Sequence, residues 1–234
     1  MPAGSPAHAP APASGTGPLR PEDLGRLGYA EALLRQRAAH AEVAAGGPGR
    51  VLLVEHPPVV TLSRRRGVRA NLLVSEEALA ARGVDLQETD RGGDVTAHGP
   101  GQLVAYPVLR LGDFGLNLSR YMRLLEAVVI ETAAAFGVSA AREEGATGVW
   151  VARPGLPDAK LCALGVRIAK NTTLHGLALN VSTDLSLFGL IDPCGLGHRP
   201  VTSLRELLGP RCPGMQEVQG VLVQRLNAAL AGAG

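Results

Sequence analysis

The stretch "VDLQETDRGGDVTAHGPGQLVAYPVL", residues 84–109, contains three segments of strand-forming residues separated by two glycine clusters. The clusters are Gly-Gly at residues 92–93 and Gly-Pro-Gly at residues 99–101, and β-prone residues follow each one. The pattern predicts strand, loop, strand, loop, strand. Glycine also lets a ligand approach the backbone closely and leaves N–H groups pointing at it, although tight hairpin turns use glycine pairs too. The two loops are therefore either simple turns or parts of a binding site.

Segments with helical periodicity lie on both sides of this stretch. Residues 29–45 place apolar side chains near helical spacing, and a Gly-Gly-Pro-Gly stop follows them. Residues 75–83 predict a shorter helix with Ser75 as its N-cap and an acidic first turn. The longest amphipathic helix is expected over residues 119–136, and two more helical segments close the chain.

Further strands are expected before and after the central stretch. The apolar run VLLVE at residues 51–55 predicts a buried strand, and Pro57 and Pro58 separate it from a second short strand. Residues 147–181 contain the strands TGVWV, KLCALGVRIA and TTLHGLALNV, joined by the turn-rich segment ARPGLPDA and a Lys-Asn turn. Strands grouped between helices without strict alternation predict an α/β (α+β) fold, with mixed or antiparallel sheets flanked by helices in a single domain.

Composition limits the class of protein. The 234-residue chain is 46% hydrophobic, which is enough to form one buried core. We expect a single catalytic domain at residues 21–234, after a disordered, Pro/Ala-rich tail at residues 1–20. A net charge of +2 gives no general field for nucleic acid or an anionic membrane, and no window of ~18 apolar residues predicts a transmembrane helix. The three cysteines lack a CxxC spacing, which argues against a disulfide framework and a zinc site. We therefore expect a soluble, cytoplasmic protein without a metal.

One cysteine occupies an unusual position for a core residue. In "IDPCGLGHRPVTSL", residues 191–204, Cys194 lies between Pro193, which bars regular helix continuation, and Gly195, which permits unusual backbone conformations. A thiol on such a turn is accessible to other groups and is not packed in the core. The pattern alone fits a tight structural turn as well as it fits a reactive thiol.

Several side chains are candidate partners for this thiol. Lys160 begins the strand KLCALGVRI, where it is either a solvent-exposed edge lysine or a cation that favours the thiolate, which is the nucleophilic form. His175 and His198 are available as alternative bases. His98 is ambiguous, because a loop histidine more often bonds to the backbone than takes part in chemistry.

Four motifs occur in this order along the chain: DRGGDVTAHGPGQLVAYPVL, KLCALGVRI, TTLHGLALNVSTDLS, and IDPCGL followed by VTSL. In order and spacing they resemble the lipoyl(octanoyl)transferase family. The resemblance extends from about Leu52 to Leu207. It implies a single α/β domain with the fold of biotin and lipoate protein ligases. It also implies an enzyme that moves an octanoyl group, through a cysteine thioester, to a lysine of an acceptor protein.

The resemblance also implies partners and site residues. The donor would be octanoyl-acyl carrier protein, and the acceptors would be the lipoyl domains of 2-oxoacid dehydrogenase E2 subunits and the glycine-cleavage H protein, with no cofactor. Cys194 would carry the acyl group, and Lys160 would act beside it. The arginines at residues 64–66, with Arg69, are either a solvated loop or a contact for acidic carrier proteins. The residues that would line the acyl site are Arg91, Gly92, Gly93, Asp94, Val95, Thr96, Ala97, His98, Ala163, Leu164, Gly165, Gly176, Leu177 and Ala178.

The sequence departs from the family pattern in three places. Ala97 stands where relatives often have tyrosine or histidine, Ala163 stands where some have serine, and the connection before Lys160 is lengthened. The two alanines could reshape the acyl pocket. Of the other cysteines, Cys162 is expected in the core of its strand, and Cys212 lies in a turn outside any family motif.

Two other functions fit the same residues less well. An ATP-dependent lipoate or biotin ligase would have a similar architecture, but it needs no cysteine nucleophile. A non-catalytic protein that only binds lipoyl domains or carrier proteins would tolerate the loss of Cys194 and Lys160. The presence of both residues favours transfer over these alternatives.

Overall fold

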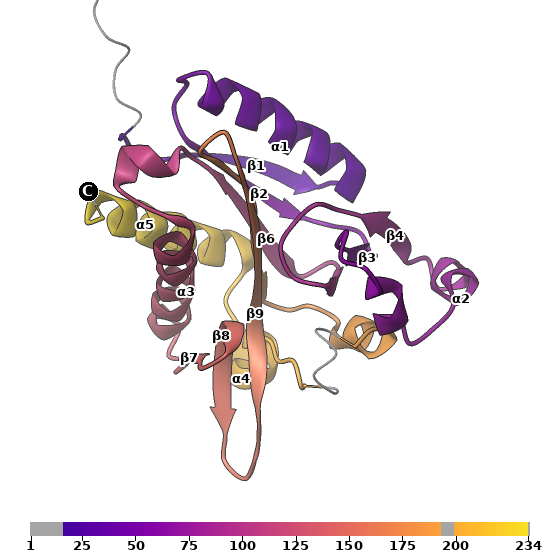
Figure 1. Ribbon diagram of the computed structural model, residues 1–234. Helices are drawn as coiled ribbons and strands as arrows, with labels where there is room; N and C mark the ends of the chain where they lie inside the picture. Colours follow the sequence, from indigo (N-terminus) through magenta and orange to yellow (C-terminus); the bar gives the residue numbers. More distant parts are fainter. Residues whose placement is uncertain (1–15, 193–198, 234) are drawn as a thin grey trace, which may run out of the picture.

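A computed structural model describes residues 16–192 and 199–233 (Figure 1). A seven-stranded sheet has the order β1-β2-β6-β10-β9-β8-β7, and a three-stranded sheet has the order β4-β3-β5. The strands are β1 Arg20–Arg26, β2 Arg50–Glu55, β3 Val59–Leu62, β4 Asp85–Glu88, β5 Val95–His98, β6 Gln102–Val108, β7 Ala141–Glu143, β8 Ala146–Arg153, β9 Leu156–Ala169 and β10 Thr172–Asn180. The helices are α1 Tyr29–Ala44, α2 Glu76–Ala81, α3 Leu118–Ala135, α4 Leu204–Leu208 and α5 Met215–Ala231. Both sheets contain parallel and antiparallel pairs, so the predicted mixed α/β fold is confirmed.

Helices cover both faces of the large sheet. α1 lies on one face, and α3 and α5 lie side by side on the other (Figure 1). In β2, Val51 and Leu53 pack into the core on the α3/α5 side, whereas Leu52 and Val54 pack against α1. Successive side chains of a strand point to opposite faces, so a strand covered on both faces is apolar throughout. This explains the uninterrupted apolar run of residues 51–55.

The predicted helices and their caps are present. The Ser75 side chain accepts a hydrogen bond from the Ala78 N–H at the start of α2, as predicted. Asn117 caps α3 in the same way by accepting from the Arg120 N–H. These side chains satisfy backbone donors that the first turn of a helix leaves unpaired.

The N-terminal edge of the sheet begins within the segment that the composition assigned to a tail. Leu19 is only 2% exposed, and its N–H donates to Asn227 Oδ1 at 2.8 Å. Arg20 begins β1, which pairs in parallel with β2 at the sheet edge. The segment RPEDLGR has no alternating apolar pattern because an edge strand with exposed side chains needs none. Residues 1–15 lie outside the described part of the chain.

The turn-rich segment ARPGLPDA is mostly strand. β8 continues to Arg153 and β9 starts at Leu156, so the chain reverses at Pro154 and Gly155, where Gly155 has φ +73°. The hairpin of β8 and β9 extends beyond the rest of the sheet (Figure 1). The Arg153 guanidinium donates to the Pro157 carbonyl across it. The lengthened connection before Lys160 is therefore a longer hairpin, and Lys160 lies inside β9.

Candidate active site

One cavity of about 520 Å³ collects the predicted acyl-site residues from β5, β9, β10 and the loop before β5. Ala97 is the exception among the described residues of that prediction. Its side chain packs beneath the small sheet with Val60 and Leu62, because Thr96 and His98 occupy the opposite face of β5. The side chain of Ala97 therefore does not line this cavity. The predicted residues that line the cavity are Lys160, Arg91, Gly92, Gly93, Asp94, Val95, Thr96, His98, Ala163, Leu164, Gly165, Gly176, Leu177 and Ala178.

Glycine allows three backbone segments to meet at this cavity. Gly165 of β9 pairs with Gly176 of β10. A Cβ on Gly165 would lie 2.7 Å from the Gly92 carbonyl oxygen, and a Cβ on Gly176 would lie 2.2 Å from the Ala105 carbonyl oxygen. The Gly92 N–H donates to the Val166 carbonyl at 3.0 Å, which fixes the glycine loop against β9. Gly92 of the first predicted cluster, together with Gly165 and Gly176, therefore serves close backbone approach at the cavity.

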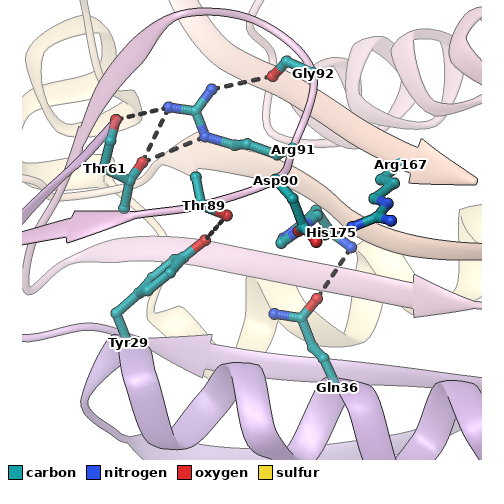
Figure 2. A network of polar contacts seen from close by, with 9 residues as sticks. All are labelled: Tyr29, Gln36, Thr61, Thr89, Asp90, Arg91, Gly92, Arg167 and His175. Carbon is teal, nitrogen blue, oxygen red and sulfur yellow. Dashed lines mark hydrogen bonds and ion pairs between the residues drawn. The ribbon is translucent and has the colours of Figure 1, made fainter. Parts of the chain in front are cut away.

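Arg91 holds the same loop from its other side. Its Nη2 donates to the Thr61 carbonyl at 2.9 Å and to Thr61 Oγ1 at 3.0 Å, and its Nη1 donates to the Gly92 carbonyl (Figure 2). Asp94 follows the loop, and Arg65 Nη1 donates to both of its carboxylate oxygens. Arg91 therefore shapes the loop through main-chain contacts in addition to lining the cavity.

His175 lies at the end of the cavity next to α1, in a strained backbone conformation. Its φ is +59°, its N–H donates to Gln36 Oε1 at 3.0 Å, and its Nε2 lies 2.8 Å from Asp90 Oδ1 (Figure 2). Asp90 also forms an ion pair with Arg167. Burial lowers the pKa of His175, although the hydrogen bond to Asp90 opposes that shift. Partial burial disfavours the Asp90 carboxylate, but the hydrogen bond with His175 and the charges of His175 and Arg167 outweigh it, so the pKa of Asp90 is below its ordinary value.

Two more buried histidines form a cluster with tyrosines at this end. His56 Nδ1 lies 2.7 Å from the Leu27 carbonyl oxygen, so it must donate, and Nε2 can then accept from the Tyr106 hydroxyl at 2.8 Å. His98 stacks on Tyr29 at a centroid distance of 6.1 Å. Burial, together with the nearby His56, lowers the pKa of His98 to about 3, and burial lowers the pKa of His56. Both rings are therefore neutral at neutral pH.

A chain of side-chain hydrogen bonds leads from this cluster toward Lys160. His98 Nδ1 donates to Gln102 Oε1 at 2.7 Å, Gln102 Nε2 donates to Asn180 Oδ1 at 2.9 Å, and Asn180 Nδ2 donates to the Thr202 carbonyl at 3.0 Å. The Thr202 N–H in turn donates to the Lys160 carbonyl at 3.0 Å. The two ends of the cavity are thus joined by one bonded path.

The chain on either side of Cys194 is anchored at two places. Cys194 itself, like His198, lies outside the described residues. Before it, the Asp192 N–H donates to the Asn71 carbonyl at 2.8 Å, and Ile191 forms a bridge with Leu72. After it, the Pro200 carbonyl accepts from the Lys160 N–H at 2.9 Å. The described residues before the segment therefore lie against Asn71 and Leu72, and those after it lie beside Lys160.

Lys160 itself lies next to aromatic and cationic groups. Its Nζ is 4.5 Å from the ring centre of Trp150, and Arg199 Cζ is 4.0 Å from the same centre. Sequence patterns did not point to Trp150, Arg199, Tyr29 or Tyr106. Tyr106 and Arg199 lie within quoted stretches but carried no assigned role, and Tyr29 and Trp150 lie outside the four motifs. All four line the cavity with Lys160.

The remaining cysteines and arginines have structural explanations. Cys162 is fully buried in the core, as expected, and burial raises the pKa of its thiol. Burial also raises the pKa of the half-buried Cys212. Arg69 pairs with Glu76 and Glu88, so this member of the basic run is largely neutralised.

Within residues 16–192 and 199–233, His, Cys, Asp and Glu form no cluster suited to a metal ion, and no helix is long and apolar enough to span a bilayer.

The chain is an α/β domain with mixed sheets. Glycine-containing strands line its cavity, and Lys160 lies at one end of it. Residues 28–227 match the lipoyl protein ligase A/B catalytic domain, and the chain belongs to this family. An octanoyltransferase of Nitratidesulfovibrio vulgaris (strain Miyazaki F) is 47% identical over 89% of this chain and 93% of its own length. An octanoyltransferase of Bacteroides fragilis (strain YCH46) is 50% identical over 77% of this chain and 81% of its own.

Solved structures confirm the fold. The bipartite lipoate protein ligase of Thermoplasma acidophilum superposes with a TM-score of 0.73 at 16% identity, over 92% of this chain and 84% of that one. Biotin protein ligase from Aquifex aeolicus superposes with a TM-score of 0.54 at 14% identity, over 90% and 70%. At these identities the likeness shows a shared architecture, as the resemblance implied.

Proposed function

We propose that the protein transfers an octanoyl group in protein lipoylation. It is an acyltransferase of the family described above. The observation that carries the proposal is its 47–50% identity to octanoyltransferases over most of both chains. The cavity supports it, because the four motifs contribute residues to its lining, which includes several glycines and alanines together with Lys160.

The proposed donor is octanoyl-acyl carrier protein, and the proposed acceptors are lysines of E2 lipoyl domains and of the glycine-cleavage H protein. The octanoyl tail has about seven carbons beyond the carbonyl, and its burial would contribute on the order of 5 kcal/mol at ~0.8 kcal/mol per methylene. Discrimination against a chain one methylene shorter would then be only about fourfold. A cavity of about 520 Å³ lies within the usual size range of small-ligand sites.

In the first half-reaction, the proposed nucleophile is the thiolate of Cys194. An ordinary thiol is only a few per cent ionised at neutral pH, so a nearby ammonium raises the reactive fraction. Lys160 is the proposed source of that charge. The Cys194 sulfur forms a bond to the acyl carbon, the bond from that carbon to the carrier sulfur breaks, and the carrier leaves as a thiol after taking a proton.

In the second half-reaction, the acceptor lysine loses a proton and its nitrogen attacks the Cys194 thioester. The new C–N bond is an amide, and Cys194 is released as a thiolate. Anchoring of Pro200 and Thr202 to the backbone of Lys160 supports a pairing of the two residues, since Cys194 lies only six positions before Pro200 in the chain.

Intact-protein mass spectrometry tests this proposal. The protein is incubated with octanoyl-acyl carrier protein without an acceptor, and wild type is compared with Cys194→Ser and Lys160→Ala. We expect an octanoyl adduct that hydroxylamine removes, that is absent in Cys194→Ser and that forms slowly in Lys160→Ala. Failure of wild type to form an adduct, while a lipoyl domain is modified only with ATP and free octanoate, would instead establish a ligase of the same fold. Binding of these partners without any modification would establish a non-catalytic protein.

A further inference from the structure

Trp150 contacts the two cations at the Lys160 end of the cavity. The centre of its ring is 4.5 Å from Lys160 Nζ and 4.0 Å from Arg199 Cζ. Only 3% of the residue is exposed to solvent. The face of an indole ring attracts cations, and this attraction strengthens when the contact is shielded from water. One buried ring therefore offsets the mutual repulsion of two positive charges.

Local backbone geometry places the ring opposite Lys160. Trp150 of β8 is the direct cross-strand partner of Lys160 in β9, at an irregularity in register between Val149 and Trp150. Paired residues on adjacent strands project to the same face, where their side chains can touch. The indole Nε1 donates to the Ala146 carbonyl at 3.4 Å, which sets the ring orientation.

Gly148 leaves the space in which this contact forms. A Cβ at Gly148 would lie 3.2 Å from Lys160 Cε, 3.4 Å from Trp150 Nε1 and 2.9 Å from the Cys162 carbonyl oxygen. Its φ of +132° is also rarely adopted by other residues. The strand irregularity and the glycine together shape the meeting point of Trp150 and Lys160.

The second cation connects this ring to the chain that returns from Cys194. Arg199 forms an ion pair with Glu143 of β7, and the following residue, Pro200, accepts the N–H of Lys160. The Lys160 ammonium and the chain that leaves the Cys194 segment therefore share one aromatic support.

We propose that Trp150 is a positioning residue, which fixes the Lys160 ammonium and the Arg199 side chain at this end of the cavity. The inference rests on the proposed function, because the positioning serves transfer only if Lys160 assists Cys194. The ring favours the ammonium over the neutral amine. Loss of the ring would therefore move the alkaline limit of the reaction to lower pH.

The first test measures the rate of Cys194 acylation by octanoyl-acyl carrier protein as a function of pH. We expect Trp150→Leu to lower the rate on the order of tenfold and to move its alkaline half-maximum to lower pH. Trp150→Phe keeps an aromatic face and should recover most of both effects. Val151→Ala removes a buried side chain from the next position of β8, away from the cavity, and should leave the pH profile unchanged. Equal profiles for Trp150→Leu and Val151→Ala would overturn the proposal.

The second test needs no substrate. Trp150 is the single tryptophan of the chain, so intrinsic fluorescence reports on its surroundings. We expect an alkaline titration step that survives in Cys194→Ser and disappears in Lys160→Met. A step unchanged in Lys160→Met would show that the ring does not contact the ammonium. If wild type shows this step but never forms an acyl adduct, the contact stands and the proposed function fails.

Discussion

At the end of the cavity next to α1, the side chains around His56 are neutral rings and hydroxyls, and the Asp90–Arg167 ion pair lies only beside His175. At the Lys160 end, two cations are placed against one indole ring. His56 in the loop after β2, His98 of β5 and Tyr106 of β6 are all buried, and burial lowers the pKa of both histidines. Lys160 of β9 and Arg199 are half-buried. Under the proposed function, the first region would be a rigid wall for the acyl chain and the second a charged end for the chemistry.

The largest expected effect is at the rigid wall. Gly176→Ala places a Cβ 2.2 Å from the Ala105 carbonyl oxygen and 2.8 Å from Pro107 Cδ, in the centre of the sheet. Overpacking of this kind costs about 3 kcal/mol, because backbone must move. The free energy of unfolding, measured with denaturant, checks this. Gly189→Ala meets no atom within 4 Å and is the matched control, so equal losses in the two variants would show that the wall is not tightly packed.

The next prediction concerns the stability of the folded protein at acid pH. His98 has a pKa of about 3 in the folded protein and about 6.5 when unfolded, so the unfolded chain binds more protons between these values. Stability from this group is fully present above pH ~6.5 and is lost as the pH falls toward 3, by about 2–3 kcal/mol at pH ~4.5. His98→Gln should flatten the dependence of unfolding free energy on pH in this window. An identical slope in the variant would mean that His98 is not held neutral.

Much of the fold and part of the site can be predicted from sequence because the signals are local. Helix caps such as Ser75, the apolar run of β2 and the glycine motifs each determine structure within a few residues. The cluster of Tyr29, His56 and Tyr106 leaves no such signal, because α1, the loop after β2 and β6 meet only after the sheet has formed. For the same reason the contact of Trp150 with Lys160 depends on a strand irregularity that no spacing encodes.

A smaller effect is expected from one hydroxyl of the rigid wall. Tyr106→Phe leaves His56 Nε2 without its donor in a buried position, while the aromatic packing stays. An unsatisfied buried acceptor costs about 1–2 kcal/mol. Thermal and denaturant unfolding of the variant measure the loss. Tyr29→Phe is a useful control, since its hydroxyl bonds to Thr89 instead, and it should not alter the environment of His56.

The smallest effect is expected at the charged end. Glu143→Gln removes the ion-pair partner of Arg199, but both side chains are partly exposed, so the pair contributes less than about 1 kcal/mol. Salt screens exposed pairs and hardly affects buried neutral hydrogen bonds. The difference in unfolding free energy between wild type and Glu143→Gln should therefore shrink at high salt, whereas the difference between wild type and Tyr106→Phe should remain. If both differences respond equally to salt, the two ends of the cavity do not differ in electrostatic character, because only a contact between charges should weaken as ions are added.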